Sequence, residues 1–251
     1  MRFASLASGS RGNALLVEFG DTLLMIDCGL TLRDVEERLG ALGRCPADVA
    51  GVLVTHEHHD HLRGVAPFAR RHDVPVWMTP GTARAADGFG EVNVLSSHRP
   101  FRIGGIAVEP FPVPHDAREP CQFVLRAGGR RLGVLTDTGH VTLHIRERLS
   151  RCHALALECN HDAEELARSS YPPSVKMRVA SPYGHLNNAQ AAALVESCVH
   201  AELQWVVAMH VSERNNSPER VRGALAPALD PARIPLHVAE QDRVSGWLEI
   251  A

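Results

Sequence analysis

The six-residue sequence His-Glu-His-His-Asp-His at positions 56–61 is the feature that most constrains this chain, and it directly follows an apolar run at 52–54. Side chains in an extended segment alternate between two faces, so we expect His56, His58 and Asp60 to point the same way, with His61 joining them if the chain turns. Imidazole and carboxylate ligands suit zinc, iron or manganese better than calcium or magnesium. The segment is too irregular for a low-complexity surface tract. It therefore predicts a divalent-metal site, and its surplus of ligands favours two ions.

The composition is that of an ordinary globular protein, with 251 residues, a net charge of −3 and 45% hydrophobic residues. This length can bury a real core, and without an evident linker we expect one domain spanning residues 1–251. No apolar run approaches the roughly 20 residues of a membrane span, and the first residues lack the apolar stretch of a secretory signal. The six cysteines form no Cys-x-x-Cys pair, so we expect reduced thiols and a cytoplasmic location.

Arginine supplies all but one of the 26 basic residues, the exception being Lys176. Base-composition bias is the simplest explanation, although arginine pairs such as 70–71 and 130–131 could grip phosphates bidentately. The overall charge gives no basic footprint, and seven Phe, three Trp and two Tyr leave few platforms for stacking bases. Any nucleic-acid binding is therefore expected to be confined to the immediate site.

The order of predicted elements indicates two β-sheets packed face to face. Strands are predicted at 13–19 and 22–26, paired across a turn at 20–21, and then at 51–55 and 74–78. Helices are predicted from Thr31, which with Asp34 resembles a capping box, to about 43, and at 62–71. The segment 93–135 is mostly β. Helices at 142–150, 162–169, 188–200 and 218–229 then alternate with strands at 153–158, 204–209 and 245–250. This pattern predicts an α/β (α+β) fold, an αββα sandwich of two mixed sheets with helices outside.

Several apolar strands end in a side chain that can bind a metal. Four of the predicted strands are followed at once by Asp27, His56, Asp137 and His210, and a fifth β segment ends at His115. Singly, an Asp after a strand is more often a turn residue. Because sites are usually built from loops at one edge of a rigid sheet, the repetition together with residues 56–61 predicts a common site.

Longer motifs carry a resemblance that extends over essentially the whole chain. They are Ser-Gly-Ser-Arg-Gly-Asn at 8–13, the Thr55–His61 segment, His-Asp-Ala at 115–117, Thr-Asp-Thr-Gly at 136–139, Asn-His-Asp at 160–162, Gly-His-Leu-Asn-Asn at 184–188 and the segment 210–216. In these motifs the chain resembles the metallo-β-lactamase-fold hydrolases, and within them the YycJ-like nuclease branch. The third motif, Val-Pro-His-Asp-Ala at 113–117, departs from the Pro-Gly-His-Thr type of lactam- and thioester-cleaving members, which argues against those reactions.

The resemblance implies two metal ions held by seven side chains. One ion would be bound by His56, His58 and His115, the other by Asp60, His61 and His210, with Asp137 between them. Asp27 would support the ligands without binding a metal. The ions implied are zinc or manganese, with iron also compatible with these ligands.

Two such ions, roughly 3.5–4 Å apart, can lower the pKa of a bridging water and clamp both the attacking and leaving oxygens of a phosphodiester. Asp60 would orient the resulting hydroxide and accept its proton. By similarity to tRNA-processing relatives, His185 is the candidate general acid or phosphate-binding group. The alternative for His185 is a role in capping the helix that starts at Asn188.

Five further polar residues are candidates for substrate binding. Ser8, Ser10 and Asn13 lie in a glycine-punctuated turn that could offer backbone N–H groups to a phosphate, although an ordinary β-turn would look the same. Asn160 follows a predicted strand, and Asn187 stands where the branch usually has serine. Asn160 is expected to line the cleft, and Asn187 is a further candidate for substrate binding.

The leading prediction is a metal-dependent phosphodiesterase acting on nucleic acid, a DNA exonuclease if it follows the branch it resembles. One alternative is hydrolysis of a small cyclic or esterified phosphate, which the near-neutral charge and scarce aromatic residues would suit. The other is a metal-binding regulatory protein that keeps the ligands without turnover. An intact ligand set together with His185 argues against the regulatory alternative.

Overall fold

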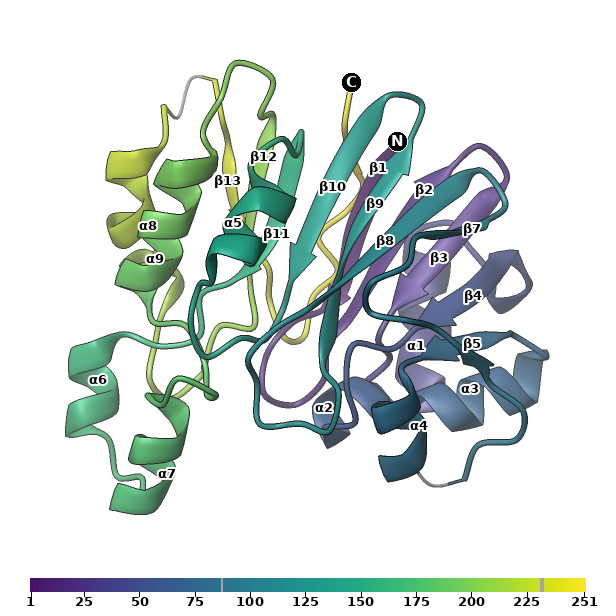
Figure 1. Ribbon diagram of the computed structural model, residues 1–251, viewed down its shortest axis with the longest axis horizontal. Helices are drawn as coiled ribbons and strands as arrows, with labels where there is room; N and C mark the ends of the chain where they lie inside the picture. Colours follow the sequence, from purple (N-terminus) through teal and green to yellow (C-terminus); the bar gives the residue numbers. More distant parts are fainter. Residues whose placement is uncertain (87, 231–232) are drawn as a thin grey trace.

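The computed structural model describes residues 1–86, 88–230 and 233–251, and across them two seven-stranded sheets pack face to face (Figure 1). The first sheet has the order β14-β1-β2-β3-β4-β5-β6. Its strands are β1 (Arg2–Ala7), β2 (Ala14–Phe19), β3 (Thr22–Ile26), β4 (Val49–Leu53), β5 (Val76–Met78), β6 (Asn93–Val94) and β14 (Leu248–Glu249).

The second sheet has the order β13-β12-β11-β10-β9-β8-β7. Its strands are β7 (Phe101–Ile103), β8 (Ile106–Pro112), β9 (Cys121–Ala127), β10 (Arg130–Leu135), β11 (Ala154–Glu158), β12 (Trp205–Met209) and β13 (Leu236–Val238). Each sheet combines antiparallel with parallel pairs, because hairpins such as β2–β3 alternate with crossovers through helices. The predicted αββα sandwich is confirmed.

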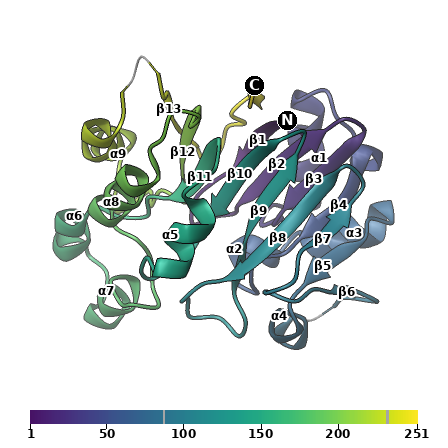
Figure 2. The same cartoon turned by 45° about the horizontal axis from the view of Figure 1, so that its top comes forward.

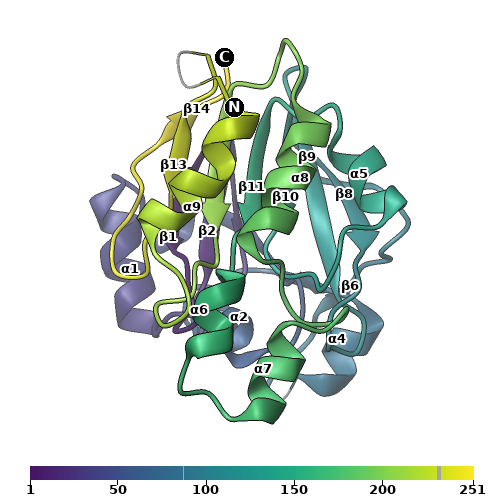
Figure 3. The same ribbon diagram turned by 90° about the vertical axis from the view of Figure 1, so that its left-hand side faces the viewer.

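Helices cover the outer faces of both sheets and the end where the site lies. Those that follow strands of the first sheet are α1 (Leu32–Ala41), α2 (His59–Leu62), α3 (Val65–His72) and α4 (Pro80–Ala85); those of the second half are α5 (Leu143–Leu149), α6 (Ala163–Arg168), α7 (Pro173–Val179), α8 (Asn188–Cys198) and α9 (Pro218–Leu225), with short 3-10 turns at Pro46–Asp48 and Ala226–Ala228. Figure 3 shows α6 and α7 at the same end of the molecule as α2. The described residues include no helix that could cross a bilayer.

The core lies in three layers that follow the alternation of each strand. In β9, Phe123 and Leu125 point between the sheets, whereas Val124 points outward beneath the helices of the second half. On the outer face of the first sheet, Met25 belongs to the same buried cluster as Phe68 of α3. Strands buried on both faces explain why the sequence reads as short apolar runs rather than alternating ones.

Most predicted elements are present, with shifts that have local causes. Thr31 caps α1 by accepting a hydrogen bond from the Asp34 N–H, as predicted. The single predicted helix at 62–71 is instead two helices that break at Gly64, whose N–H donates to the Cys28 carbonyl at 2.7 Å. A Cβ at Gly64 would lie 2.1 Å from the Leu30 carbonyl oxygen, so this close approach requires glycine.

Other boundaries also differ from the prediction. The strand expected at 51–55 lies at 49–53, and the closing strand expected at 245–250 is reduced to 248–249. Four helices or strands, β1, α4, α7 and β13, were not predicted. Two of these begin at proline, and Pro80 and Pro173 sit at the first helical position, where proline is tolerated because its missing N–H would have no partner in the helix.

Candidate metal centre

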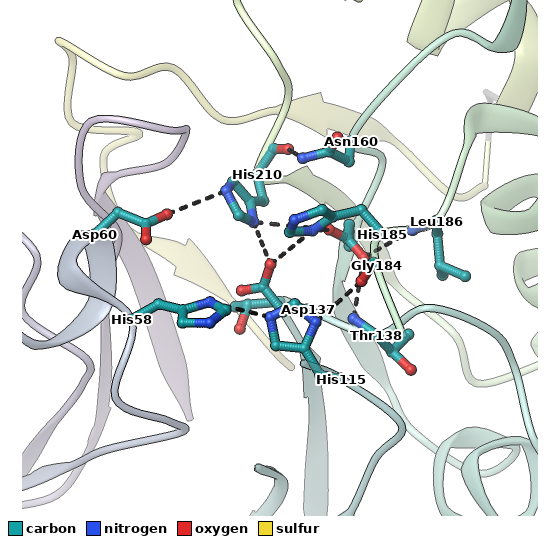
Figure 4. A network of polar contacts seen from close by, with 12 residues as sticks. His58, Asp60, His115, Asp137, Thr138, Asn160, Gly184, His185, Leu186 and His210 are labelled. Atoms are coloured by element: carbon teal, nitrogen blue, oxygen red, sulfur yellow. Dashed lines mark hydrogen bonds and ion pairs between the residues drawn. The ribbon is translucent and has the colours of Figure 1, made fainter. Parts of the chain in front are cut away.

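The strand ends that carry metal-competent side chains meet at one edge of the sandwich. Strands β3 and β4 are parallel, as are β10, β11 and β12, so their carboxyl ends face the same way within each sheet. These ends deliver Asp27 and His56 from the first sheet, and Asp137, Glu158 and His210 from the second. Figure 4 shows how side chains distant in sequence turn toward a common centre.

The segment 56–61 reaches this centre by a different route from the predicted one. The chain is extended only through His58, which has a β conformation and precedes α2 without a side-chain capping bond, and the helix begins at His59. The expected alternation of faces therefore does not extend to Asp60. Asp60 and His61 are instead brought to the centre by the first helical turn, which directs both side chains back toward Asp137 and His210.

Among the residues that the structure describes, four groups of side chains hold potential ligand atoms within 4.8 Å of one another. These groups are His56–His58–His115, Asp60–His61–His210, His56–His61–Asp137, and Asp137–Glu158–His185–His210. The structure thus brings together all seven residues that the sequence assigned to metals. Their individual ligand roles remain predictions, and the fourth group shows that His185 and Glu158 are also placed near enough to be ligands.

The hydrogen bonds behind the histidines fix which ring nitrogen is presented to the centre. In each case one nitrogen faces a protein oxygen and acts as donor, which leaves the other as an acceptor. The pairs are His56 Nδ1 to Thr55 Oγ1 at 2.9 Å, His58 Nε2 to the Asp116 carbonyl at 3.1 Å, His61 Nδ1 to Asp27 Oδ2 at 2.7 Å and His115 Nδ1 to the Gly184 carbonyl at 3.0 Å. When each of these rings is neutral, its inward nitrogen carries a lone pair, and these lone pairs converge as a metal requires.

Unpartnered buried atoms support the same conclusion. Among the described residues, His56 Nε2, both carboxylate oxygens of Asp137 and His210 Nδ1 are buried without a hydrogen bond of good geometry. Yet His210 Nδ1 lies only 2.7 Å from Asp137 Oδ1. Buried polar atoms that are close together but not aimed at one another are expected where the atoms surround a common ion. The residues present fit a divalent metal site.

The centre combines neutral imidazoles with an ionised carboxylate. Burial lowers the pKa of His115 to about 4 and holds that of His56 well below its ordinary value, so both are neutral, as ligands must be. Burial would also raise the pKa of Asp137, but His210 and His61 outweigh it and hold the pKa of this carboxylate well below its usual range. Asp137 is therefore ionised at neutral pH.

Asp27 holds Thr55 and His61 in place by hydrogen bonds. Its carboxylate accepts hydrogen bonds from the Thr55 N–H and the Thr55 hydroxyl, both at 2.8 Å, and a third from His61. Asp27 has a left-handed backbone, with φ of 58°, a conformation that Asp and Asn tolerate better than most residues. Its contacts place it behind His61 and away from the converging nitrogens, which fits the predicted supporting role.

Glu158 is the functional candidate that sequence reasoning missed. It ends β11, is fully buried, and accepts a 2.6 Å hydrogen bond from His185 Nδ1 and further bonds from the Thr138 and Leu186 N–H groups. Burial alone would lower the pKa of His185, but the Glu158 and Asp137 carboxylates raise it to about 9. The signal was present, because Glu158 follows an apolar strand as the other strand-end residues do.

A cavity of about 340 Å³ opens beside the centre. Its wall includes Asp60 and His185 from the centre and two predicted substrate-binding residues, Ser10 and Asn160. It also includes side chains of the α6–α7 segment that were not predicted, namely Tyr171, Val175, Arg178 and Val179. The cavity therefore combines a ring, apolar surface and a guanidinium next to the candidate metal ligands.

Three predicted substrate-binding residues do not line this cavity. Ser8 and Asn13 are buried: the Ser8 hydroxyl accepts a hydrogen bond from the His210 N–H at 2.6 Å, and Asn13 bonds to Gly9 in both directions. Asn187 caps α8 by accepting from the Gln190 N–H. The predicted direct contact with substrate thus does not match their placement, because each uses its polar atoms within the chain. The cap at Asn187 also removes the alternative that His185 caps this helix.

Comparisons with known proteins agree with the geometry. The model for the Beta-lactamase superfamily domain matches residues 22–211. The chain is 33% identical over 238 residues to Exodeoxyribonuclease YycJ from Bacillus anthracis, covering 92% of this chain and 89% of that protein. It is 30% identical over 226 residues to Exodeoxyribonuclease WalJ from Streptococcus pneumoniae, covering 87% and 84%. The solved structure of the metallo-β-lactamase fold protein YhfI from Bacillus subtilis superposes with a TM-score of 0.72 at 13% identity, covering 97% of this chain and 99% of that one.

Proposed function

Because this chain belongs to the metallo-β-lactamase superfamily, in its YycJ-like branch, and is a metal-dependent hydrolase, we propose that it cleaves phosphodiester bonds of DNA as an exonuclease. The observation that carries the proposal is the convergence of the seven side chains on one centre, with Asp60, His185 and His210 lining the cavity beside it. The relatives named as exodeoxyribonucleases cover most of the chain, and their name supplies the substrate class.

Two divalent ions bound in this centre would supply the Lewis acidity that activates water and neutralises charge on the phosphate. The chain's own residues would do the rest. Asp60, which lines the cavity and whose carboxylate lies 3.6 Å from His61 Nε2 and 3.4 Å from His210 Nε2, would orient the attacking water and take its proton. His185 uses Nδ1 for Glu158, so Nε2 is the atom that would donate a proton to the leaving oxygen.

The cavity also suits a nucleotide. Tyr171 offers a ring face on which a base could stack, and Arg178, held by Asp116 at 2.9 Å, offers a guanidinium for an adjacent phosphate. Ser10, from the glycine-punctuated turn, borders the same space. These features support a nucleotide more than a substrate without a base.

The test begins with purified protein supplied with manganese or zinc and bis(p-nitrophenyl) phosphate. We expect hydrolysis by the native chain and none by Asp60→Ala, with metal content measured for both. Duplex and single-stranded DNA and RNA, labelled at the 5′ or 3′ end, then separate nuclease activity from action on small diesters. Hydrolysis of the small diester without release of nucleotides from any polymer would contradict the exonuclease proposal. Bound metal without cleavage of any diester would favour a regulatory protein.

A further inference from the structure

An arginine-rich surface lies at the end of the second sheet opposite the candidate metal centre. Four arginines line a shallow hollow of about 310 Å³ around the β7–β8 and β9–β10 turns: Arg102, Arg126, Arg130 and Arg131. Figure 1 shows the β9–β10 turn at the same end as the two termini, and away from α2. We call these four residues the arginine surface.

The strand register sets the spacing of this surface. Arg102 pairs with Ala107, Ala107 with Arg126, and Arg126 with Arg131, so these positions form one row across four strands. Residues directly opposite in an antiparallel pair point to the same face, and neighbouring strands lie about 4.8 Å apart. The row therefore places Arg102 about 10 Å from Arg126. Figure 2 shows that α5 leaves this end of β7–β9 uncovered.

The surface carries more positive charge than its acidic neighbour can neutralise. Glu109 borders this surface through ion pairs, with Arg126 and Arg148 at 2.8 Å and with Arg131 at 3.8 Å. In the described part of the chain, neither Arg102 nor Arg130 pairs with a carboxylate. One shared acid holds several guanidinium groups in place while leaving a net positive surface, although the whole chain has a charge of −3.

We propose that the arginine surface binds the phosphate backbone of a duplex whose end is in the metal centre, an inference that rests on the proposed function. Strand β10 begins in this surface at Arg130 and leads to Asp137 in the centre. Seven residues of extended chain span about 23 Å, which equals about seven base pairs of duplex DNA. The planar guanidinium group matches the geometry of a phosphate. Contacts from a row of arginines to phosphates do not depend on the base sequence, which an exonuclease acting along DNA requires. This proposal departs from the sequence-based expectation that nucleic-acid contacts are confined to the immediate site.

The experiment uses the double variant Arg102→Gln/Arg130→Gln, which leaves the partners of Glu109 intact. Binding of duplexes of about 4, 8 and 16 base pairs is measured by fluorescence anisotropy at several salt concentrations, without turnover. We expect the native chain to bind duplexes longer than about seven base pairs more tightly. The variant should lose about tenfold or more of that gain at low salt, and the slope of log K against log salt should fall by about 2.

The matched control is Arg33→Gln/Arg71→Gln, which removes the same charge from exposed positions on α1 and α3. An equal loss in this control, or an equal loss for the 4- and 16-base-pair duplexes, would overturn the proposal. So would unchanged duplex binding with weakened binding to anionic lipid vesicles, which would assign the surface to a membrane. Hydrolysis of bis(p-nitrophenyl) phosphate is measured in parallel. Its absence in the native chain would refute the proposed function, whereas the binding data would still decide the role of the surface.

Discussion

Two buried carboxylates stand behind histidines on opposite sheets, and they differ in what their histidines can do. Asp27 on the first sheet holds His61, whose Nε2 turns into the centre 2.8 Å from Asp137. Glu158 on the second sheet holds His185, which lines the cavity. The same contact, a carboxylate accepting from Nδ1, thus serves a candidate metal ligand on one side and a candidate proton donor on the other. The role follows from where Nε2 points.

The largest effect is expected at the residue that joins the two halves, Asp137. The variant Asp137→Asn keeps the shape but removes the charge that lies against His61 and His210. We expect turnover of bis(p-nitrophenyl) phosphate to fall by at least about 10³-fold and the bound metal to fall below the native content. Metal analysis and steady-state kinetics measure this. Asp162→Asn, a helix cap at the end of the molecule that carries the centre, is the control. Native metal content with native turnover in Asp137→Asn would contradict the prediction that Asp137 links the ligands of the two sheets.

Replacement of Asp27 should act on metal affinity. Asn tolerates the left-handed backbone at this position, so Asp27→Asn should fold, but His61 loses its charged acceptor. Partners that orient a metal-ligating histidine are typically worth 10- to 100-fold in affinity, and we expect a loss of about that size. Titration of the metal-free protein with zinc or manganese measures it. Native affinity in the variant would remove Asp27 from the supporting role.

Replacement of Glu158 should lower catalysis without changing metal affinity, in contrast to replacement of Asp27. If His185 donates a proton to the leaving oxygen, Glu158→Gln lowers kcat on DNA about tenfold or more while metal affinity stays native. The p-nitrophenolate leaving group is a stable anion and needs little protonation, so the small diester should be much less affected. Loss of metal together with equal losses on both substrates would instead make His185 a ligand, as the group formed with Asp137, Glu158 and His210 allows.

The sequence predicted the first-sheet side of this comparison better than the second. The segment 56–61 is contiguous, so its chemistry is readable without knowing the fold. Glu158 becomes meaningful only once β11 is known to lie between β10 and β12, and Arg178 only once α7 is known to border the cavity. The predicted orientation of Asp60 was wrong because it assumed that the chain stays extended through this residue. The pattern of alternating residues does not reveal that a helix begins at His59.

The turn at residues 8–13 shows the same limit for substrate contacts. The sequence identified Ser8, Ser10 and Asn13 as one polar turn, but burial divides them. Ser8 supports the backbone of His210, which adopts a positive φ of 50°, and only Ser10 reaches the cavity. Sequence pattern locates a site, whereas the face each side chain presents depends on long-range packing.

The smallest expected effect concerns His161, a buried histidine in the same region whose Nδ1 has no hydrogen-bond partner among the described residues. Burial lowers its pKa from 6.5 to about 4, opposite to the shift of His185. Because the folded pKa lies below the unfolded one, the unfolded chain binds more protons between pH 6.5 and 4, so this residue lowers the unfolding free energy as pH falls through that window. At pH 5 the penalty is up to about 2 kcal/mol. Urea unfolding of the native chain and of His161→Gln at pH 8, 6 and 5 measures the difference. The variant is neutral throughout, so its stability relative to the native chain should rise toward pH 5. A constant difference across this range would show that the imidazole is not held neutral by burial.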